Sequence, residues 1–152
     1  MRLLEALTKE CILPDIVCGN KQEVLEALAS PLAGLCGVSC SELVQVIMER
    51  ERLGSTGIGN GLAIPHGKLK KIGSLILGFG RSLKGVDFDA LDGKPTHIFF
   101  VLIAPENAPG DHLKMLARIS RFLKDESFRK RLMGAVSQDE IYGVIESQDS
   151  EF

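Results

Sequence analysis

Apolar residues recur at helical spacing in the first third of the chain. Asn20 and Glu23 form a capping box that opens a helix. We expect its buried side to carry Val24, Leu25, Leu28, Leu32 and Leu35. Pro31 lies inside this pattern, so the helix should kink or end near residue 30. A second capping box opens a helix to about Arg50, and its residues are Ser39 and Glu42, with Leu43, Val46 and Ile47 expected to be buried.

The last third of the chain has the same helical character. Asp111 is the expected N-cap of a helix from His112 to about Lys124. Its predicted apolar side consists of Leu113, Leu116, Ile119 and Leu123. Residues 126–133 predict a short basic helix, and Ser137 with Glu140 caps a last one. The polar tail from Ser147 to Phe152 should fray.

Between these helical regions the pattern changes to strands. Thr96 to Ala104 is apolar on both alternating faces, which is typical of a strand in the middle of a covered sheet. Residues 1–10 are weakly helical. Shorter strands are predicted at Ile12 to Val17, Leu62 to Ile64, Ser74 to Gly80 and Val86 to Phe88, with a turn at Leu91 to Lys94. No repeat or linker interrupts the pattern, so we expect a single domain over residues 1–152 with its core at about 3–146.

Composition narrows the class of protein. A chain of 152 residues with 45% apolar and 25% charged residues fits one globular domain. The net charge of −2 gives no reason to expect nucleic acid or an anionic membrane as partner. No segment has the run of about 20 apolar residues that a membrane span needs. The N-terminus lacks a signal-peptide pattern, so we expect a cytoplasmic protein without membrane insertion.

The four cysteines do not form a paired C-x-x-C zinc pattern. Without a secretory signal, disulfides are not expected either. We interpret Cys11, Cys18, Cys36 and Cys40 as small apolar side chains. A metal site built from these thiols and the three histidines is the alternative, and we expect no metal and no cofactor.

The strongest local signal is the glycine-rich stretch from Leu53 to Lys68. Its glycines, Gly54, Gly57, Gly59 and Gly61, let backbone N–H groups approach a ligand closely. A buried strand follows them, and Pro65 and Gly67 then flank His66 at the end of that strand. A flexible loop that can bind an anion, followed by an exposed imidazole, favours a histidine that handles phosphate over a histidine buried in the core.

Two commoner glycine motifs do not fit this stretch. Gly54 and Gly59 have the spacing of a P-loop, but Asn60-Gly61 stands where Lys and Ser or Thr are required. The dinucleotide fingerprint G-x-G-x-x-G fails because the third glycine comes one residue early. Neither nucleotide-binding interpretation holds.

The segment LGSTGIGNGLAIPHGK, Leu53 to Lys68, resembles the active-site signature of enzyme IIA of the bacterial phosphotransferase system. Within that system it is similar to the fructose/mannitol class and most closely to the nitrogen-regulatory branch, and a weaker likeness extends over nearly the whole chain. The resemblance implies an α/β fold in which helices flank a mixed sheet on both faces. It also implies that a histidine-containing phosphocarrier protein transiently phosphorylates His66.

The resemblance further implies which residues are catalytic. His66 is the nucleophile, and its Nε2 takes the phosphoryl group while the other ring nitrogen keeps its proton on a backbone carbonyl. Arg50 stands at the position of the family's active-site arginine, where a guanidinium pairs with phosphoryl oxygens. His112 stands where the family has a histidine that faces the nucleophile and stabilises the transition state.

The remaining polar residues of the stretch have weaker assignments. The hydroxyls of Ser55 and Thr56 and the amides around Gly57 and Gly59 are the expected phosphate-binding groups. Lys68 either attracts an acidic partner or is a solvated surface residue, and Arg52 is interpreted as a docking or surface charge. His97 is expected to have a structural or edge role on its apolar strand.

Four functions stay open at this point. The first is a nitrogen-regulatory enzyme IIA that reports its phosphorylation state to target proteins. The second is a sugar-specific enzyme IIA that passes phosphate to a IIB domain. The third is a binding module without phosphorylation, and the fourth is a metal-binding protein.

Overall fold

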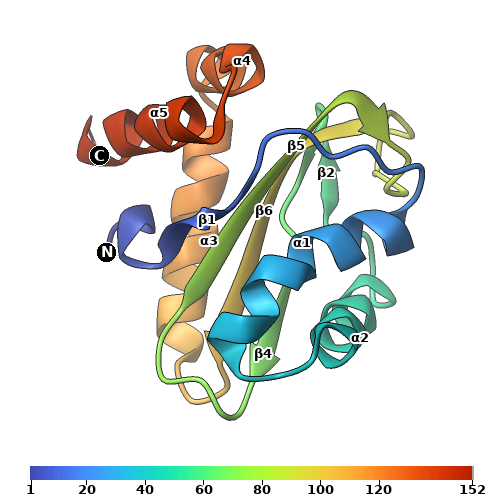
Figure 1. Cartoon of the computed structure of the whole chain (residues 1–152), viewed down its shortest axis with the longest axis vertical. Coiled ribbons are helices and arrows are strands. Elements are labelled where there is room, and N and C mark those ends of the chain that lie inside the picture. The colour runs from blue at the N-terminus through green and yellow to red at the C-terminus, as the bar shows by residue number, and fades with distance from the viewer. Residues whose placement is uncertain (152) are drawn as a thin grey trace.

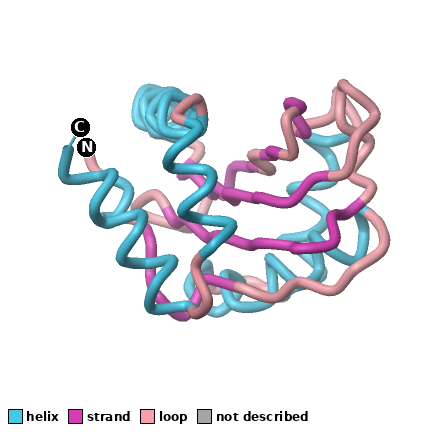
Figure 2. The backbone as a smooth tube through the Cα atoms, turned by 90° about the horizontal axis from the view of Figure 1, so that it is seen from above, coloured by secondary structure: helices cyan, strands magenta, loops and turns pink. Residues whose placement is uncertain are grey.

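A single mixed sheet forms the centre of the molecule, and helices cover both of its faces (Figure 2). The computed structural model describes residues 1–151. The strands in sheet order are β1 (Leu7–Leu13), β5 (Ile76–Val86), β6 (Thr96–Pro105), β3 (Leu62–Ala63) and β2 (Gly57–Gly59), and β4 (His66–Leu69) also pairs with β6. β5 is antiparallel to β6, whereas β3 and β4 are parallel to it. The predicted α/β class, with a mixed sheet flanked on both faces, is confirmed.

The α-helices of the first third of the chain cover one face of the sheet, and those of the last third cover the other (Figure 1). On one face lie α1 (Lys21–Cys36) and α2 (Cys40–Glu51). On the other face lie η1 (Leu3–Glu5), α3 (Pro109–Leu123), α4 (Glu126–Gly134) and α5 (Gln138–Glu151). Phe99, Val101 and Ile103 of β6 pack toward α1 and α2, and Ile98, Phe100 and Leu102 pack the other way. This explains the apolar pattern of the central strand, whose predicted place is confirmed.

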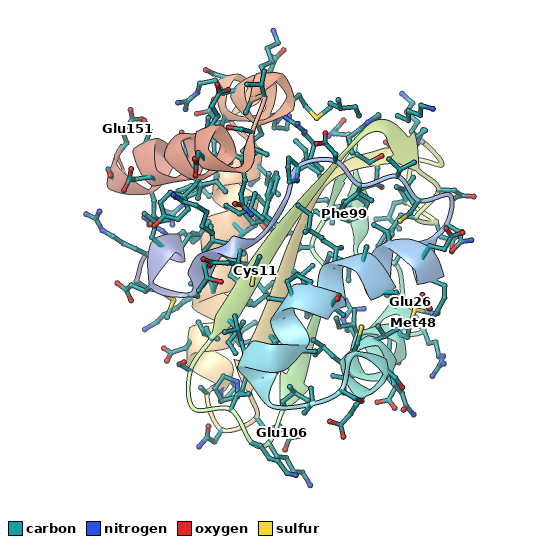
Figure 3. All side chains as sticks on the ribbon, in the orientation of Figure 1. Cys11, Glu26, Met48, Phe99, Glu106 and Glu151 are labelled. Atoms are coloured by element: carbon teal, nitrogen blue, oxygen red, sulfur yellow. The ribbon has the colours of Figure 1, made fainter. Side chains whose placement is uncertain are left out.

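The layer under α1 and α2 is filled by side chains from strands and helices, among them Cys11 and Phe99 (Figure 3). Cys11 and Cys36 are buried and all four cysteines are free thiols. Burial raises the pKa of the Cys36 thiol to about 11. These two thiols therefore behave as the apolar side chains expected from the sequence.

Helix α1 begins as predicted, because the Asn20 side chain accepts a hydrogen bond from the Glu23 amide at 2.9 Å. A kink or an end was expected near residue 30, and an end is wrong, since the helix continues through Pro31 to Cys36. Apolar residues are buried against the sheet on both sides of the proline, namely Leu28, Ala29, Leu32 and Ala33. This packing outweighs the cost of about 3 kcal/mol that proline carries inside a helix. Leu35, predicted to be buried, is 51% exposed.

The first strand also differs from its prediction. β1 occupies Leu7–Leu13, where weak helix was expected, and it pairs with β5 through Leu7↔Leu77 and Ile12↔Phe79. Its polar middle, residues 8–10, is exposed along the edge of the sheet, so its composition does not look strand-like. On the neighbouring strand, β5 runs unbroken to Val86, where two separate strands were expected.

The C-terminal end contradicts the expected fraying. α5 extends to Glu151, and Gln148 and Asp149 within it are buried. The Asp149 carboxylate accepts hydrogen bonds from the Leu3 and Leu4 amides and lies 2.8 Å from Arg118 Nη2. Phe152, the last residue of the predicted tail, lies outside the described residues.

Among residues 1–151, no single helix is long and apolar enough to cross a membrane. The pair α1 and α2 meets that length and composition test only when taken together, and it is bent by 116°.

Candidate active site around His66

The backbone around His66 fixes the orientation of its ring. β3 and β4 both run beside β6, and Ile64 and Pro65 separate them. The Pro65 carbonyl accepts from the Leu102 amide at 3.0 Å, whereas the Ile64 carbonyl faces His66 Nδ1 at 2.8 Å. Because a carbonyl can only accept, Nδ1 carries the proton and Nε2 keeps its lone pair. His66 therefore begins a strand, rather than ending one as expected, and the predicted anchoring of one ring nitrogen on a backbone carbonyl is present.

The ring of His112 faces the ring of His66. The ring centres are 5.4 Å apart and the planes are nearly perpendicular, at 79°. His112 is 6% exposed, and its Nε2 is buried without a hydrogen-bond partner among the described residues. A buried ring nitrogen of this kind is costly unless a ligand satisfies it. His112 Nε2 is therefore a buried polar atom that a bound ligand could satisfy.

The start of α3 differs from its prediction. The N-cap is Ala108, and Pro109 occupies the first helical position, so Asp111 is not the cap. Proline suits this position because its fixed φ matches the helix and its missing N–H is not needed there. The His112 amide already donates to the Ala108 carbonyl at 3.1 Å. The imidazole, and not a free backbone N–H of His112, is therefore the group available to a ligand.

Arg50 lies in the last turn of α2, and its Nη1 donates to the Gly54 carbonyl at 2.9 Å. The helix comes close to His66 because residue 67 is glycine: a Cβ there would lie 2.8 Å from Val46 Cγ1. Arg50 follows Val46 by one helical turn on the same face. The close packing of β4 on α2 therefore brings the guanidinium to the histidine.

These side chains line one open pocket of about 520 Å³. Its lining residues are Val46, Glu49, Arg50, Leu53, His66, Gly67, Lys68, Pro109, His112, Leu113 and Leu116. The structure thus brings together the three predicted catalytic residues from three different elements. Lys68 joins them, whereas Arg52 and His97 do not line this pocket. His97 Nδ1 instead bonds the Ser82 carbonyl at 2.9 Å on β5, which agrees with a structural role.

The predicted phosphate-binding groups lie away from the pocket. The Ser55 hydroxyl donates to the Phe88 carbonyl at 3.1 Å and accepts from the Gly57 amide at 3.0 Å. Thr56 is 4% exposed, and its hydroxyl donates to Glu51. Gly57 and Gly59 form the short strand β2. The Ser55 and Thr56 hydroxyls and the Gly57 amide thus have partners within the protein, and phosphate contact by this loop stays a prediction.

The turn between β2 and β3 was not predicted from the sequence. Asn60 and Gly61 both have positive φ, 57° and 76°, as a two-residue hairpin turn of the Asn-Gly type requires. The Asp92 carboxylate accepts from the Asn60 amide at 3.0 Å and so fixes the turn from outside. The Asn60-Gly61 pair was the available signal for this hairpin.

Residues 5–148 match the protein family described as "Phosphoenolpyruvate-dependent sugar phosphotransferase system, EIIA 2". This chain belongs to the EIIA 2 family. A nitrogen regulatory protein of Bradyrhizobium diazoefficiens is 39% identical over 145 residues, which cover 95% of each chain. A fructose-specific EIIABC component of Bacillus subtilis is 37% identical over 98% of this chain, which spans 24% of that protein. The crystal structure of IIA-Ntr from Neisseria meningitidis has a TM-score of 0.88 at 35% identity, covering 93% of this chain and 97% of that one.

Burial favours the neutral form of both site histidines of this EIIA chain. Burial lowers the pKa of His66; the hydrogen bond to the Ile64 carbonyl opposes this effect, and nearby Arg50 reinforces it. Burial also lowers the pKa of His112, with smaller contributions from His66 and Lys68 in the same direction. A free histidine titrates at about pH 6.5. Near neutral pH the His66 ring therefore offers a lone pair.

These shifts predict how the stability of the EIIA chain depends on pH. Because the folded-state pKa values are lowered, the unfolded chain binds more protons than the folded chain as pH falls through about 6.5. The free energy of unfolding should therefore decrease from pH 7.5 to pH 5.5. Urea denaturation at several pH values measures this slope. His66→Gln and His112→Gln should each make the slope shallower, and an unchanged slope in both variants contradicts the prediction.

Sequence reasoning missed two contributors to the site. The first is Glu51, a buried carboxylate next to Arg50, to which no role was assigned from the sequence. The second is the close approach at Gly67, for which the only signal was a glycine after Pro65-His66.

Among residues 1–151, no cluster of three or more His, Cys, Asp or Glu side chains is arranged to hold a metal ion.

Proposed function

We propose that this EIIA chain is a nitrogen-regulatory phosphoryl carrier, in which His66 Nε2 accepts a phosphoryl group from a histidine-containing phosphocarrier protein. The observation that carries the proposal is the fixed His66 ring, with Nδ1 on the Ile64 carbonyl, next to the ring of His112, whose buried Nε2 has no partner among the described residues. We place the reaction in the cytoplasm, where phosphoenolpyruvate is available.

The proposed transfer step moves one phosphoryl group between two imidazoles. The lone pair of His66 Nε2 attacks phosphorus, a new N–P bond forms, and the N–P bond to the donor histidine breaks, its electron pair returning to the donor ring. His66 keeps its Nδ1 proton, so the phosphorylated ring is cationic and the Ile64 carbonyl stabilises that charge. Arg50 and His112 offer donors to the phosphoryl oxygens, and transfer depends mainly on such positioning and charge.

The rim of the pocket favours a protein as phosphoryl donor. Leu53 is 85% exposed and Leu113 is 68% exposed, and both line the pocket beside His66. Exposed apolar side chains gathered around a polar centre are typical of protein interaction sites. A phosphocarrier protein that presents its own histidine from an apolar surface fits this rim.

The names of the relatives favour the regulatory branch. The Bradyrhizobium relative is named a nitrogen regulatory protein, and we propose that this chain likewise regulates target proteins through its phosphorylation state. The fructose-specific relative of Bacillus subtilis supports the alternative, in which the chain passes phosphate to a sugar-type IIB domain. Fast loss of label from the phosphorylated chain to such a IIB domain would decide for the alternative.

A loading experiment tests the proposal. The chain is incubated with phosphoenolpyruvate, the first enzyme of the relay and a phosphocarrier protein. We expect one acid-labile, base-stable phosphate per chain. Nitrogen-15 NMR of the histidines should place the phosphorus on Nε2 of His66. Absence of labelling with phosphocarriers of both the sugar and the regulatory relay would overturn the proposal.

Arg50→Ala should slow phosphoryl transfer to His66 by about 100-fold, because one donor to the developing charge is lost. The free energy of unfolding should change by less than about 1 kcal/mol, since the side chain makes one exposed hydrogen bond to Gly54. Rapid-quench labelling and urea denaturation measure the two effects. Arg52→Ala is the matched control, because Arg52 does not line the pocket. A large loss of stability with an unchanged rate would make Arg50 structural instead.

A further inference from the structure

Glu51 is buried at the C-terminal end of α2 and is 5% exposed. Its Oε1 accepts from Lys21 Nζ at 2.9 Å and from the Thr56 amide at 3.1 Å, and its Oε2 accepts from the Thr56 hydroxyl. Lys21, the first residue of α1, lies 4.7 Å from the centre of the Phe88 ring. A buried carboxylate is tolerated only when donors surround it in this way.

These hydrogen bonds close a loop that begins at the end of α2. Glu51 and Thr56 form its two ends, and both carboxylate oxygens contact the Thr56 amide, at 3.1 and 3.3 Å. Gly54 lies inside the loop, and its carbonyl accepts from Arg50 Nη1 at 2.9 Å. The Glu51 carboxylate therefore fixes the loop whose Gly54 carbonyl binds the Arg50 guanidinium.

We propose that Glu51 is a positioning residue for phosphoryl transfer, which closes the Glu51–Thr56 loop and so holds the Gly54 carbonyl that orients Arg50 beside His66. This inference rests on the proposed function of His66. It assigns no contact between Glu51 and the phosphoryl group, because Glu51 does not line the pocket. Its effect on the reaction passes through Arg50.

A charge effect on His66 gives an independent readout. Four charged or titratable groups act on the two rings: Arg50 and Lys68 lower the pKa of His66, Glu51 raises it, and the neighbouring His66 lowers the pKa of His112. Glu51→Gln removes a charge that raises the pKa of His66, and displacement of Arg50 removes one that lowers it. The shift in the His66 pKa caused by Glu51→Gln should therefore be more negative in the Arg50→Ala background than in the wild-type background. NMR titration of the imidazole protons measures both shifts, and equal shifts would contradict an effect through Arg50.

The kinetic experiment uses phosphoramidate, a small N–P donor that needs no protein docking. Glu51→Gln should lower the maximal rate of His66 labelling by about 10-fold, with little change in the half-saturating donor concentration, because a misplaced guanidinium stabilises the transition state poorly. In the Arg50→Ala background the same substitution should change the rate by less than about 2-fold, since coupled residues are not additive. Glu42→Gln, an exposed change on the same helix, is the control.

A second pair of variants keeps the test valid if Glu51→Gln folds poorly. Thr56→Val removes the hydroxyl that donates to Glu51, whereas Thr56→Ser keeps it. We expect Thr56→Val to slow labelling several-fold and Thr56→Ser to restore the rate. In the Arg50→Ala background both variants should label alike.

The outcomes separate the two proposals. If wild type takes no phosphate from phosphoramidate or from any phosphocarrier, the proposed function fails. If wild type is labelled but the rates of folded Glu51→Gln and Thr56→Val equal that of wild type, the positioning role is overturned. It is equally overturned if their losses are fully additive with that of Arg50→Ala, because Glu51 would then act independently of the guanidinium.

Discussion

Replacing His66 by glutamine should abolish phosphate loading, leaving no label above background with either phosphoramidate or a phosphocarrier. An amide nitrogen has no available lone pair, whereas the neutral imidazole presents one at Nε2 while the Ile64 carbonyl holds its Nδ1 proton. The ring is only partly buried at the mouth of an open pocket, so the substitution should leave the fold intact. Labelling followed by acid and base treatment measures the loss.

The other two histidines provide the controls. His97→Gln should label at the wild-type rate, because His97 lies outside the pocket and bonds the Ser82 carbonyl. His112→Ala should label slowly, since it removes a stabilising donor and leaves the nucleophile. If His66→Gln is still labelled while His112→Ala is not, the acceptor is His112 and the assignment of roles is reversed.

Sequence reasoning predicted three catalytic residues that share one pocket, because their signals are local or carried by family resemblance. Pro65-His66-Gly67 lies in one short motif, and the capping boxes at Asn20, Ser39 and Ser137 are satisfied in the structure. Arg50 and His112 come from remote elements, so their meeting at His66 was not visible in any spacing. The likeness to the EIIA family supplied that information, and the pocket that the three residues share agrees with it.

Three of the wrong predictions have a common physical cause. Three segments have a low intrinsic propensity for the secondary structure that they adopt: the turn of α1 at its proline, the polar middle of β1 and the polar C-terminal helix. Each is stabilised by contacts with residues that are distant in the sequence. A hydrogen-bond partner was also missed at Thr56, whose hydroxyl donates to the buried Glu51 carboxylate. Local patterns show which groups are polar. They do not show which hydrogen-bond partner each polar group has in the folded protein.

Asp149 is the strongest example of such a distant partner, and Asp149→Asn should lower the free energy of unfolding by about 3–5 kcal/mol. The carboxylate is fully buried and accepts from Leu3, Leu4 and Arg118, so every oxygen faces donors. An asparagine would turn an NH₂ group toward one of these donors and would remove the negative charge beside the buried guanidinium. For a chain of this size the melting temperature should fall by roughly 10 °C.

Asp139→Asn on the same helix is the matched control for this effect. Asp139 also forms an ion pair, at 3.0 Å with Lys9, but its side chain is 78% exposed. Solvent screens such a pair, so its loss should cost less than about 1 kcal/mol. Equal, small losses in the two variants would mean that α5 is not anchored through Asp149. A large loss in the free energy of unfolding for Asp149→Asn alone would show that the polar C-terminal segment is part of the cooperative fold, through its hydrogen bonds to residues 3 and 4. That fold supports α3 and the His112 ring.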